Sequence, residues 1–280
     1  MHWQTSRFSI DLAWPRVMGI VNVTPDSFYD GGRHATVADA IAHCETLVGE
    51  GADMLDVGGE STRPGAATAN LEQESARVLP VLRHALALGV PVSIDTSRPE
   101  LMRAALDLGA DIVNDVRALQ RPGALAVVAA FPAAGVCLMH MRGEPGSMQA
   151  APSYGDVVHE VRDFLALRAQ AAMAAGIGRD RIVLDPGIGF GKSAEHNLQL
   201  LARQAELLAV GWPLVAGWSR KSTLGLITGR AVDARLAASI AAALAAVQRG
   251  AAIVRVHDVA ATVDALKVWR VAAAGRISAH

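Results

Sequence analysis

The chain has 280 residues, of which 51% are apolar, and its formal net charge at pH 7 is −1. This composition argues against disorder, and the near-zero charge argues against a general attraction to nucleic acid or to an acidic membrane. The longest apolar run, residues 236–247, is shorter than the about 20 residues that cross a bilayer, and residues 1–10 lack the apolar core of a signal peptide. Cys44 and Cys137 show neither metal-ligand spacing nor a disulfide framework, so we expect a reducing, cytoplasmic compartment.

The first element predicted along the chain is a short β-hairpin at residues 3–12. Within it Phe8, Ile10 and Leu12 alternate with polar residues, which is the pattern of a strand with one buried face. The hairpin precedes the main pattern of the chain, and we expect it to close one end of the fold.

From residue 18 onward a unit repeats, in which a short apolar run ends in a polar residue or glycine and a stretch with helical apolar spacing follows. The runs end at Asn22, Asp56, Asp95, Asn114, His140, Asp185, Gly217 and His257. The helical stretches lie near residues 36–50, 72–88, 98–108, 122–132, 156–175, 194–209, 233–248 and 258–272. Eight such units predict the α/β class and a closed (β/α)₈ TIM barrel, with a doubly wound open sheet as the alternative. Because no Pro/Ser-rich linker divides the chain, we expect one domain over residues 1–280.

The polar residues at the strand ends are the first candidate site. In a barrel they meet at one mouth, because the carboxyl ends of parallel strands emerge on the same face. They are Asn22, Asp56, Asp95, Asn114, Asp185 and Arg255, joined by Lys221 from the loop after the seventh strand. One strand-end Asp can simply cap a helix, but several buried acids and amides are costly without partners. The set suits a flat polar heterocycle, whose amidine-like edge can donate two parallel hydrogen bonds to a carboxylate.

The most informative stretch is residues 181–193, which read Arg-Ile-Val-Leu-Asp-Pro-Gly-Ile-Gly-Phe-Gly-Lys-Ser. An apolar run typical of a buried parallel strand ends at Asp185, and a glycine-rich loop follows. Pro186 stands where a P-loop requires glycine, and Lys192 stands where a dinucleotide-binding fingerprint requires glycine or alanine. The loop matches neither motif, which leaves either a carboxylate beside a close-approaching backbone or a turn that serves only the fold.

A second candidate group is cationic and consists of Arg63, Arg220, Lys221, Arg255 and His257. The last two are two residues apart on a strand and share a face, and an Arg/His pair suits a phosphate or diphosphate. The alternative for His257 is a packed histidine that bonds a carbonyl group, and for Arg220 we favour an exposed surface charge.

Asn22 is the one candidate for a metal ligand. Its amide oxygen suits a hard cation such as Mg²⁺, but a single protein ligand means that a substrate diphosphate and water must supply the others. The histidines His43, His84 and His140 are scattered along the chain and do not form a recognisable metal-binding pattern.

Over nearly its whole length the chain resembles the dihydropteroate synthases. The resemblance rests on residues 18–28 (Met-Gly-Ile-Val-Asn-Val-Thr-Pro-Asp-Ser-Phe), 56–65 (Asp-Val-Gly-Gly-Glu-Ser-Thr-Arg-Pro-Gly), 94–97, 114–115, 138–141, 185–192, 219–222 and 255–258. This family has the barrel fold, is typically dimeric, and condenses 6-hydroxymethyl-7,8-dihydropterin diphosphate with p-aminobenzoate to give dihydropteroate and diphosphate in folate synthesis. Sulfonamides are competitive analogues of the aminobenzoate, and Mg²⁺ is the expected cofactor.

The resemblance also implies roles for individual residues. The pterin would be bound by Asp95, Asn114, Asp185, Lys221 and Arg255. The diphosphate would be held by Arg63, Arg255, His257 and a Mg²⁺ ion on Asn22. The aminobenzoate would be framed by Thr62, Pro64, Phe190, Lys221 and Ser222. Catalysis would depend on Asp95, Lys221 and Arg255. Two departures, Ile188 and Trp218 where the family often has Phe and Met, touch none of these roles.

The expected mechanism is dissociative: diphosphate leaves first, Asp95 stabilises the cation, and the neutral amine then attacks. It needs no enzyme nucleophile, consistent with the lack of a Ser/His/Asp or Cys/His set in the sequence. One alternative is a pterin-dependent methyltransferase domain, against which Arg63, residues 219–222 and the Arg255/His257 pair argue. The other is a non-catalytic paralogue that keeps only the shape, and the intact loop motifs argue against it.

Overall fold

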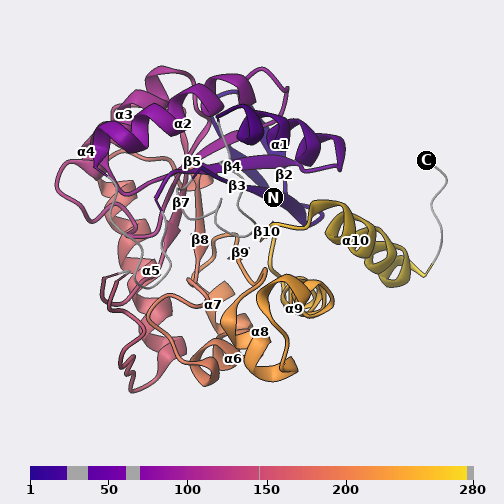
Figure 1. The fold of residues 1–280 in the computed structure, drawn as a ribbon. Helices are drawn as coiled ribbons and strands as arrows, with labels where there is room; N and C mark the ends of the chain where they lie inside the picture. The colour runs from indigo at the N-terminus through magenta and orange to yellow at the C-terminus, as the bar shows by residue number, and fades with distance from the viewer. Residues whose placement is uncertain (24–36, 61–69, 145, 276–280) are drawn as a thin grey trace.

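The computed structural model describes residues 1–23, 37–60, 70–144 and 146–275, and Figure 1 shows its helices surrounding a central group of strands. Three of the expected site residues, Thr62, Arg63 and Pro64, lie outside the described residues. In the part of the chain that is described, no helix has both the length and the apolarity needed to cross a bilayer. Cys44 and Cys137 are buried free thiols.

Eight parallel strands form the central sheet. They are β3 (Arg16–Asn22), β4 (Met54–Gly58), β5 (Val92–Asp95), β6 (Ile112–Asp115), β7 (Gly135–Met139), β8 (Ile182–Asp185), β9 (Val215–Ala216) and β10 (Ile253–Val256). Neighbouring strands follow the order β8-β7-β6-β5-β4-β3-β10-β9, and a parallel bridge between Leu184 and Leu214 joins the two ends of the sheet. The sheet is therefore closed into a barrel. The TIM-barrel prediction is confirmed, and the open doubly wound alternative is wrong.

The helical shell follows the predicted stretches, with one addition. The helices are α1 (Val37–Gly49), α2 (Leu71–Ala85), α3 (Pro99–Asp107), α4 (Ala124–Ala129), α5 (Val157–Ala174), α6 (Ala194–Ala202), α7 (Gln204–Leu208), α8 (Ser222–Thr228), α9 (Leu236–Gln248) and α10 (Val259–Ala274), with 3₁₀ turns η2 (Arg179–Arg181) and η3 (Val232–Ala234). The sequence does not predict α8, because this helix is short and buries only Thr223 and Leu224, which leaves no helical period to detect.

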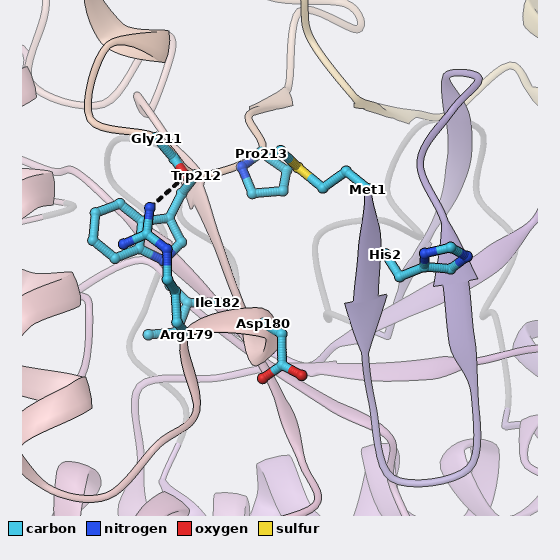
Figure 2. A pocket seen from close by; sticks show the side chains of 8 residues that line it. All are labelled: Met1, His2, Arg179, Asp180, Ile182, Gly211, Trp212 and Pro213. Carbon is cyan, nitrogen blue, oxygen red and sulfur yellow. Dashed lines mark hydrogen bonds between the residues drawn. The ribbon is translucent and has the colours of Figure 1, made fainter.

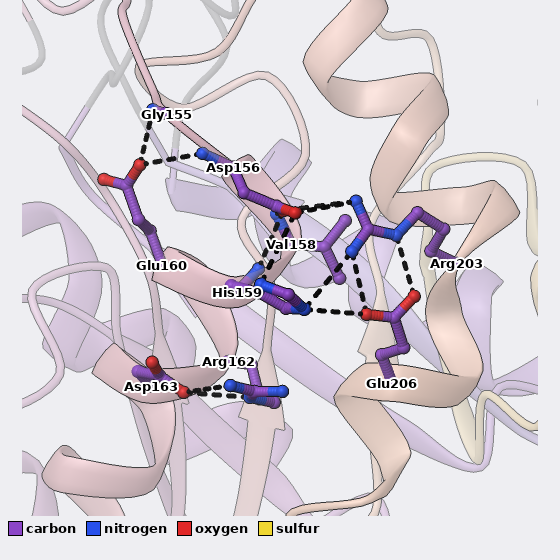
Figure 3. A network of polar contacts seen from close by, with 9 residues as sticks. All are labelled: Gly155, Asp156, Val158, His159, Glu160, Arg162, Asp163, Arg203 and Glu206. Atoms are coloured by element: carbon purple, nitrogen blue, oxygen red, sulfur yellow. Dashed lines mark hydrogen bonds and ion pairs between the residues drawn. The ribbon is translucent and has the colours of Figure 1, made fainter.

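The sixth predicted helix is in fact two helices that meet at Arg203. The backbone of Arg203 leaves the helical region (φ −104°, ψ 25°), and its guanidinium bonds Asp156 at the start of α5 at 3.1 Å and Glu206 in α7 at 2.7 Å (Figure 3). The sequence pattern conceals this break because inward-facing apolar residues, Leu200 and Leu207, continue on both sides of it.

The N-terminal hairpin closes the floor of the barrel. Strand β1 (His2–Gln4) pairs antiparallel with β2 (Ser9–Asp11), which places Trp3 opposite Ile10. Trp3 is fully buried, and its indole N–H donates to the carbonyl oxygen of Arg181 at 2.8 Å. The hairpin packs on a cluster that consists of Met18, Met54, Ile112, Cys137, Val183, Val215 and Ile253. Both the hairpin and its expected place at one end of the fold are confirmed.

Polar side chains lie at the end of the barrel opposite the hairpin, because side chains alternate along each strand. In four strands a floor residue is followed two positions later by a polar one: Met54 by Asp56, Ile112 by Asn114, Val183 by Asp185 and Ile253 by Arg255. Since side chains two apart on a strand share a face, these polar side chains point inward nearer the carboxyl ends. The apolar floor and the polar mouth are thus two consequences of one alternating pattern.

Candidate functional site

The centre of the barrel mouth is an ion cluster around Arg255. Its Nε donates to Asp56 Oδ2 at 2.6 Å and its Nη2 to Asp95 Oδ2 at 2.7 Å. Asn114 Nδ2 donates to the same Asp56 oxygen at 2.9 Å. The remaining oxygens, Asp56 Oδ1 and Asn114 Oδ1, are buried and accept no hydrogen bond from the described residues. Buried acceptors of this kind call for a donor, so the cluster can bind a ligand that carries N–H groups.

Burial and the neighbouring charges shift the pKa values of Asp95 and Arg255. Burial raises the pKa of Asp95 to about 7, the negative charge of Asp56 adds to this effect, and Arg255 opposes it. Burial lowers the pKa of Arg255, but Asp56 and Asp95 outweigh it, so the net pKa is raised and the guanidinium stays charged. Asp95 is consequently the member of the cluster whose charge changes near pH 7.

Asp185 faces this cluster from β8. Its Oδ1 accepts a hydrogen bond from the backbone N–H of Gly187 at 2.7 Å. Burial raises the pKa of Asp185, while the Gly187 N–H, Lys221 and Arg255 oppose the shift. A Cβ atom at Gly217 would lie 3.8 Å from the other carboxylate oxygen, Oδ2. Gly217 therefore leaves space beside this carboxylate, although Asp185 is only 5% exposed.

Lys221 brings a second cation to the mouth from the loop after β9. Its Nζ lies 4.3 Å from the centre of the Phe190 ring. Burial lowers the pKa of Lys221 to about 8; Arg255 contributes to this shift, and Asp185 and Asp95 oppose it. Lys221 therefore carries charge at pH 7 while lying beside both carboxylates, and the Phe190 ring forms an apolar wall next to it.

His257 and Ser219 form a bonded pair beside Lys221. The two side chains are joined between His257 Nδ1 and Ser219 Oγ at 2.9 Å, and the His257 backbone N–H donates to the same hydroxyl at 3.1 Å. Burial lowers the pKa of His257 to about 3, with Arg220 and Arg255 contributing, so the imidazole is neutral at pH 7. The partner of His257 Nδ1 is thus a hydroxyl group and not the carbonyl group of the alternative interpretation.

The side chain of Arg220 is 40% exposed and is paired with an acidic residue. Its Nη2 and Nε pair with the two oxygens of Asp258 at 2.6 and 3.1 Å, and its backbone N–H donates to Ser239 Oγ at 2.9 Å. The sequence does not reveal this pair because its members lie 38 positions apart, on different loops. Arg220 anchors the loop that presents Lys221.

Two buried residues of the site went unassigned in the sequence: Lys192 and His140. Lys192 Nζ lies 2.8 Å from His140 Nδ1, 3.0 Å from the carbonyl oxygen of Gly187 and 3.1 Å from that of Phe190. The sequence signal for them is their position inside two of the motifs on which the family resemblance rests, residues 138–141 and 185–192. They lie directly beneath the glycine-rich loop that follows Asp185.

Asn22 ends β3 at the same mouth, in register with Gly58, which in turn aligns with Asp95. Within the described ranges there is no group of three or more His, Cys, Asp and Glu side chains that could hold a metal ion. The carboxylates of Asp56 and Asp95 are already bonded to Arg255. This donor set fits only a cation that brings most of its oxygen ligands with its substrate.

A separate cavity of about 310 Å³ lies at the other end of the barrel (Figure 2). Its lining includes Arg179, Ile182 and Trp212, near the start of β8 and beside the N-terminal hairpin. None of the expected site residues lines it.

At the mouth, by contrast, the structure brings together Asp95, Asn114, Asp185, Lys221 and Arg255, with Phe190 beside Lys221.

Comparison with known proteins gives matches over most of the chain. The family model described as pterin binding enzyme matches residues 18–257. The chain is 55% identical over 273 residues to the dihydropteroate synthase of Neisseria meningitidis serogroup B, covering 95% of this chain and 96% of that protein.

Solved structures give the same result. A dihydropteroate synthase of Xanthomonas albilineans with 4-aminobenzoic acid has a TM-score of 0.90 and 52% identity, covering 98% of both chains. That of Burkholderia cenocepacia with 7,8-dihydropteroate has a TM-score of 0.89 and 50% identity, covering 98% of this chain and 97% of that one. That of Yersinia pestis with a sulfonamide drug complex has a TM-score of 0.92 and 43% identity, covering 98% and 100%.

Proposed function

The chain belongs to the pterin-binding enzymes as a dihydropteroate synthase, and we propose how its side chains divide the work of that reaction. The reaction condenses 6-hydroxymethyl-7,8-dihydropterin diphosphate with p-aminobenzoate and yields 7,8-dihydropteroate and diphosphate. Sulfonamides act as analogues of the aminobenzoate. The observation that carries the assignment of roles is the guanidinium of Arg255, held between Asp56 and Asp95 at the mouth of the barrel.

The pterin edge is recognised by acceptors and one cation. Asp185 and the unpartnered oxygens of Asp56 and Asn114 accept hydrogen bonds from the amino and ring N–H groups. Lys221 donates to the ring carbonyl or a ring nitrogen. Arg255 lies flat against the ring, since its ion pairs with Asp56 and Asp95 fix the plane of the guanidinium.

The diphosphate lies on the cationic side of the mouth. Arg255 and neutral His257 bind it, together with Arg63 from the part of the chain that is not described. The Asn22 amide oxygen would be the protein ligand of a Mg²⁺ ion, and substrate oxygens and water would have to supply the others. When bound, this ion supplies neutralisation of the negative charge on the leaving group.

The bond between the pterin methylene carbon and the diphosphate oxygen breaks first, and the bonding electrons leave with diphosphate. The positive charge on the methylene carbon spreads into the ring, where the Asp95 carboxylate stabilises it. The neutral amine of the aminobenzoate attacks the methylene carbon to form the carbon–nitrogen bond, and the resulting ammonium group releases its proton to solvent water. The Phe190 ring, Lys221 and Ser222 orient this second substrate, together with Thr62 and Pro64, which lie outside the described residues.

We also propose one barrel domain over residues 1–280 that works as a homodimer in the cytoplasm. The hairpin belongs to the same core as the strands, which supports a single domain. Exposed apolar side chains gather in one segment, at Leu226, Ile227, Val232 and Leu236, which supports a second copy as its partner. Two free, buried thiols fit a reducing compartment.

The test is an assay of the purified chain with both substrates, first with EDTA and then with Mg²⁺ restored. We expect diphosphate release and dihydropteroate formation in equal amounts, and their recovery on adding Mg²⁺. A sulfonamide should raise the apparent KM for aminobenzoate without changing kcat. Turnover that persists in EDTA would contradict the metal assignment, and a lack of turnover with Mg²⁺ would contradict the division of roles.

A further inference from the structure

The amino group of Lys192 is enclosed by its own loop, where burial lowers its pKa well below the ordinary value and the charge of Asp185 opposes the shift. Lys192 is 2% exposed, and it follows Phe190 by two positions, so the side chain folds back beneath the loop that carries it. An ammonium group has three N–H donors. Three acceptors lie within 3.1 Å: His140 Nδ1, the Gly187 carbonyl oxygen and the Phe190 carbonyl oxygen. Every donor of the buried group therefore has a partner.

His140 supplies an acceptor because its imidazole is neutral. Burial lowers the pKa of His140 to about 2, and Lys192 contributes to the shift. The ring packs edge-on against Phe164, with the ring centres 4.8 Å apart. When the Lys192 amino group is protonated and donates to Nδ1, the ring proton of the neutral imidazole resides on Nε2. The hydrogen bond between Nδ1 and the Lys192 amino group therefore helps to hold the lysine side chain in one rotamer.

The loop above this pair approaches the neighbouring backbone so closely that only glycine fits. Gly187 has φ 68°, and a Cβ there would lie 1.9 Å from the carbonyl oxygen of His140. Gly191 has φ 62°, and a Cβ there would lie 2.2 Å from the carbonyl oxygen of Arg142. Such a path turns backbone carbonyl groups inward, where each needs a donor. Lys192 supplies donors to two of them, and the Tyr154 hydroxyl donates to a third, on Gly191, at 2.8 Å.

Both ends of the loop touch the reaction site. At its start the Gly187 N–H donates to Asp185, and further along the Phe190 ring lies beside Lys221. We propose that Lys192 and His140 are a positioning pair, which sets the Phe190 ring and the Asp185 carboxylate in place for aminobenzoate and pterin. This inference rests on the roles proposed above for Phe190 and Asp185. Lys192 itself faces the loop backbone and not the mouth.

The first test is Lys192→Met, which keeps the length of the side chain and removes its donors. We expect the KM for aminobenzoate to rise about 10–100-fold, because small displacements of positioning groups have effects of this size. Lys267→Met is the matched control, since Lys267 is exposed on α10 and its Nζ reaches only Asp264, at 3.5 Å. If Lys192 has a purely structural role, Lys192→Met will have a lower melting temperature, but its KM for aminobenzoate will be unchanged when measured well below that temperature. That result would overturn the proposal.

The second test changes the histidine. His140→Leu removes one of the three acceptors and should raise the KM for aminobenzoate in the same direction, whereas His140→Gln, which restores an acceptor, should recover most of the loss. In the double variant Lys192→Met/His140→Leu, the rise in log KM for aminobenzoate should be smaller than the sum of the rises in the two single variants. The reason is that the two residues form one interaction. If Lys192→Met does not fold, the Leu/Gln pair at His140 decides: equal KM values for these two variants would overturn the proposal.

Phe190→Ala separates this inference from the function on which it rests. An unchanged KM for aminobenzoate in Phe190→Ala would mean that the proposed role of Phe190 is wrong. A raised KM in Phe190→Ala with an unchanged KM in folded Lys192→Met would mean that Phe190 has its role and that Lys192 does not position it. Raised values in both variants are the expected result.

Discussion

Arg255 on β10 and Asp95 on β5 are joined at 2.7 Å across the mouth of the barrel, although β3 and β4 separate their strands in the sheet. The long guanidinium spans this gap and also bonds Asp56 on β4. One side chain thereby connects opposite walls of the site. The arrangement places a permanent positive charge beside the two carboxylates that would otherwise repel each other.

Arg255→Ala should remove most of the activity while the barrel persists. The change deletes the cation that faces both pterin and diphosphate, and losing one such electrostatic contact typically costs about 10²–10³-fold in rate. Steady-state kinetics at saturating substrates, with circular dichroism as a check on folding, measures both effects. The control is Arg249→Ala, because Arg249 is exposed and the hydrogen bond described for its guanidinium is to the carbonyl oxygen of Ala245. Near-normal turnover in Arg255→Ala would contradict the role given to Arg255.

Asp95→Asn should stabilise the free enzyme at pH 8. The pKa of Asp95 is about 7 in the folded chain against an ordinary 3.8, so the folded state binds the proton more tightly than the unfolded state does. The free energy of unfolding of the parent chain therefore falls as pH rises from about 4 to about 7. Asn has no proton to lose at this position. The difference in the free energy of unfolding between the variant and the parent chain should therefore grow, in favour of the variant, as pH rises from about 4 to about 7. Melting curves at several pH values measure this, and an equal or lower melting temperature at pH 8 would refute it.

How far the sequence predicts this protein depends on how local each signal is. Asp185 is predictable because the buried strand that precedes it and the glycines that follow it are adjacent in the sequence. The barrel is predictable because its unit repeats. The mouth then follows, since the topology brings the ends of all parallel strands to one face.

Contacts between distant positions are what the sequence conceals. Lys192 and His140 lie 52 positions apart, and neither carries a local pattern that indicates the other. Arg220 looks like a surface charge because its partner Asp258 lies on another loop. The proposed roles of Thr62, Arg63 and Pro64 stay predictions, since these residues lie outside the part of the chain that the structure describes.

The pH dependence of kcat/KM should be bell-shaped with a maximum between pH 7 and 8. Asp95 must be ionised to stabilise the pterin cation, and its pKa of about 7 sets the acid limb. Lys221 must be charged to donate to the pterin, and its pKa of about 8 sets the alkaline limb. Lys221→Met should lower the maximum and remove the alkaline limb. An alkaline limb that survives in this variant would show that another group controls it.

Asp185→Asn should weaken pterin binding about 10–100-fold, because hydrogen bonds to a charged group contribute about 1.5–3 kcal/mol. The Asn side chain can still accept from the Gly187 N–H, but its NH₂ group would face the donors of the pterin edge. Isothermal titration calorimetry with the pterin substrate in the absence of aminobenzoate measures the change directly. Asp233→Asn, at an exposed site on η3, serves as the control. Unchanged affinity would refute the paired hydrogen bonds proposed for Asp185.

Leu226→Glu should convert the proposed homodimer into monomers. Leu226 on α8 is 75% exposed and lies in the same segment as three other exposed apolar residues, so a partner surface there would be apolar and a buried carboxylate would be unpaired. Leu167→Glu is the matched control, because Leu167 is 65% exposed on α5, outside this segment. Sedimentation velocity over a range of concentrations should show dimers for the parent chain and for Leu167→Glu, and monomers for Leu226→Glu. If all three sediment as dimers, the interface lies on another face; if the parent chain sediments as a monomer, the homodimer proposal is wrong.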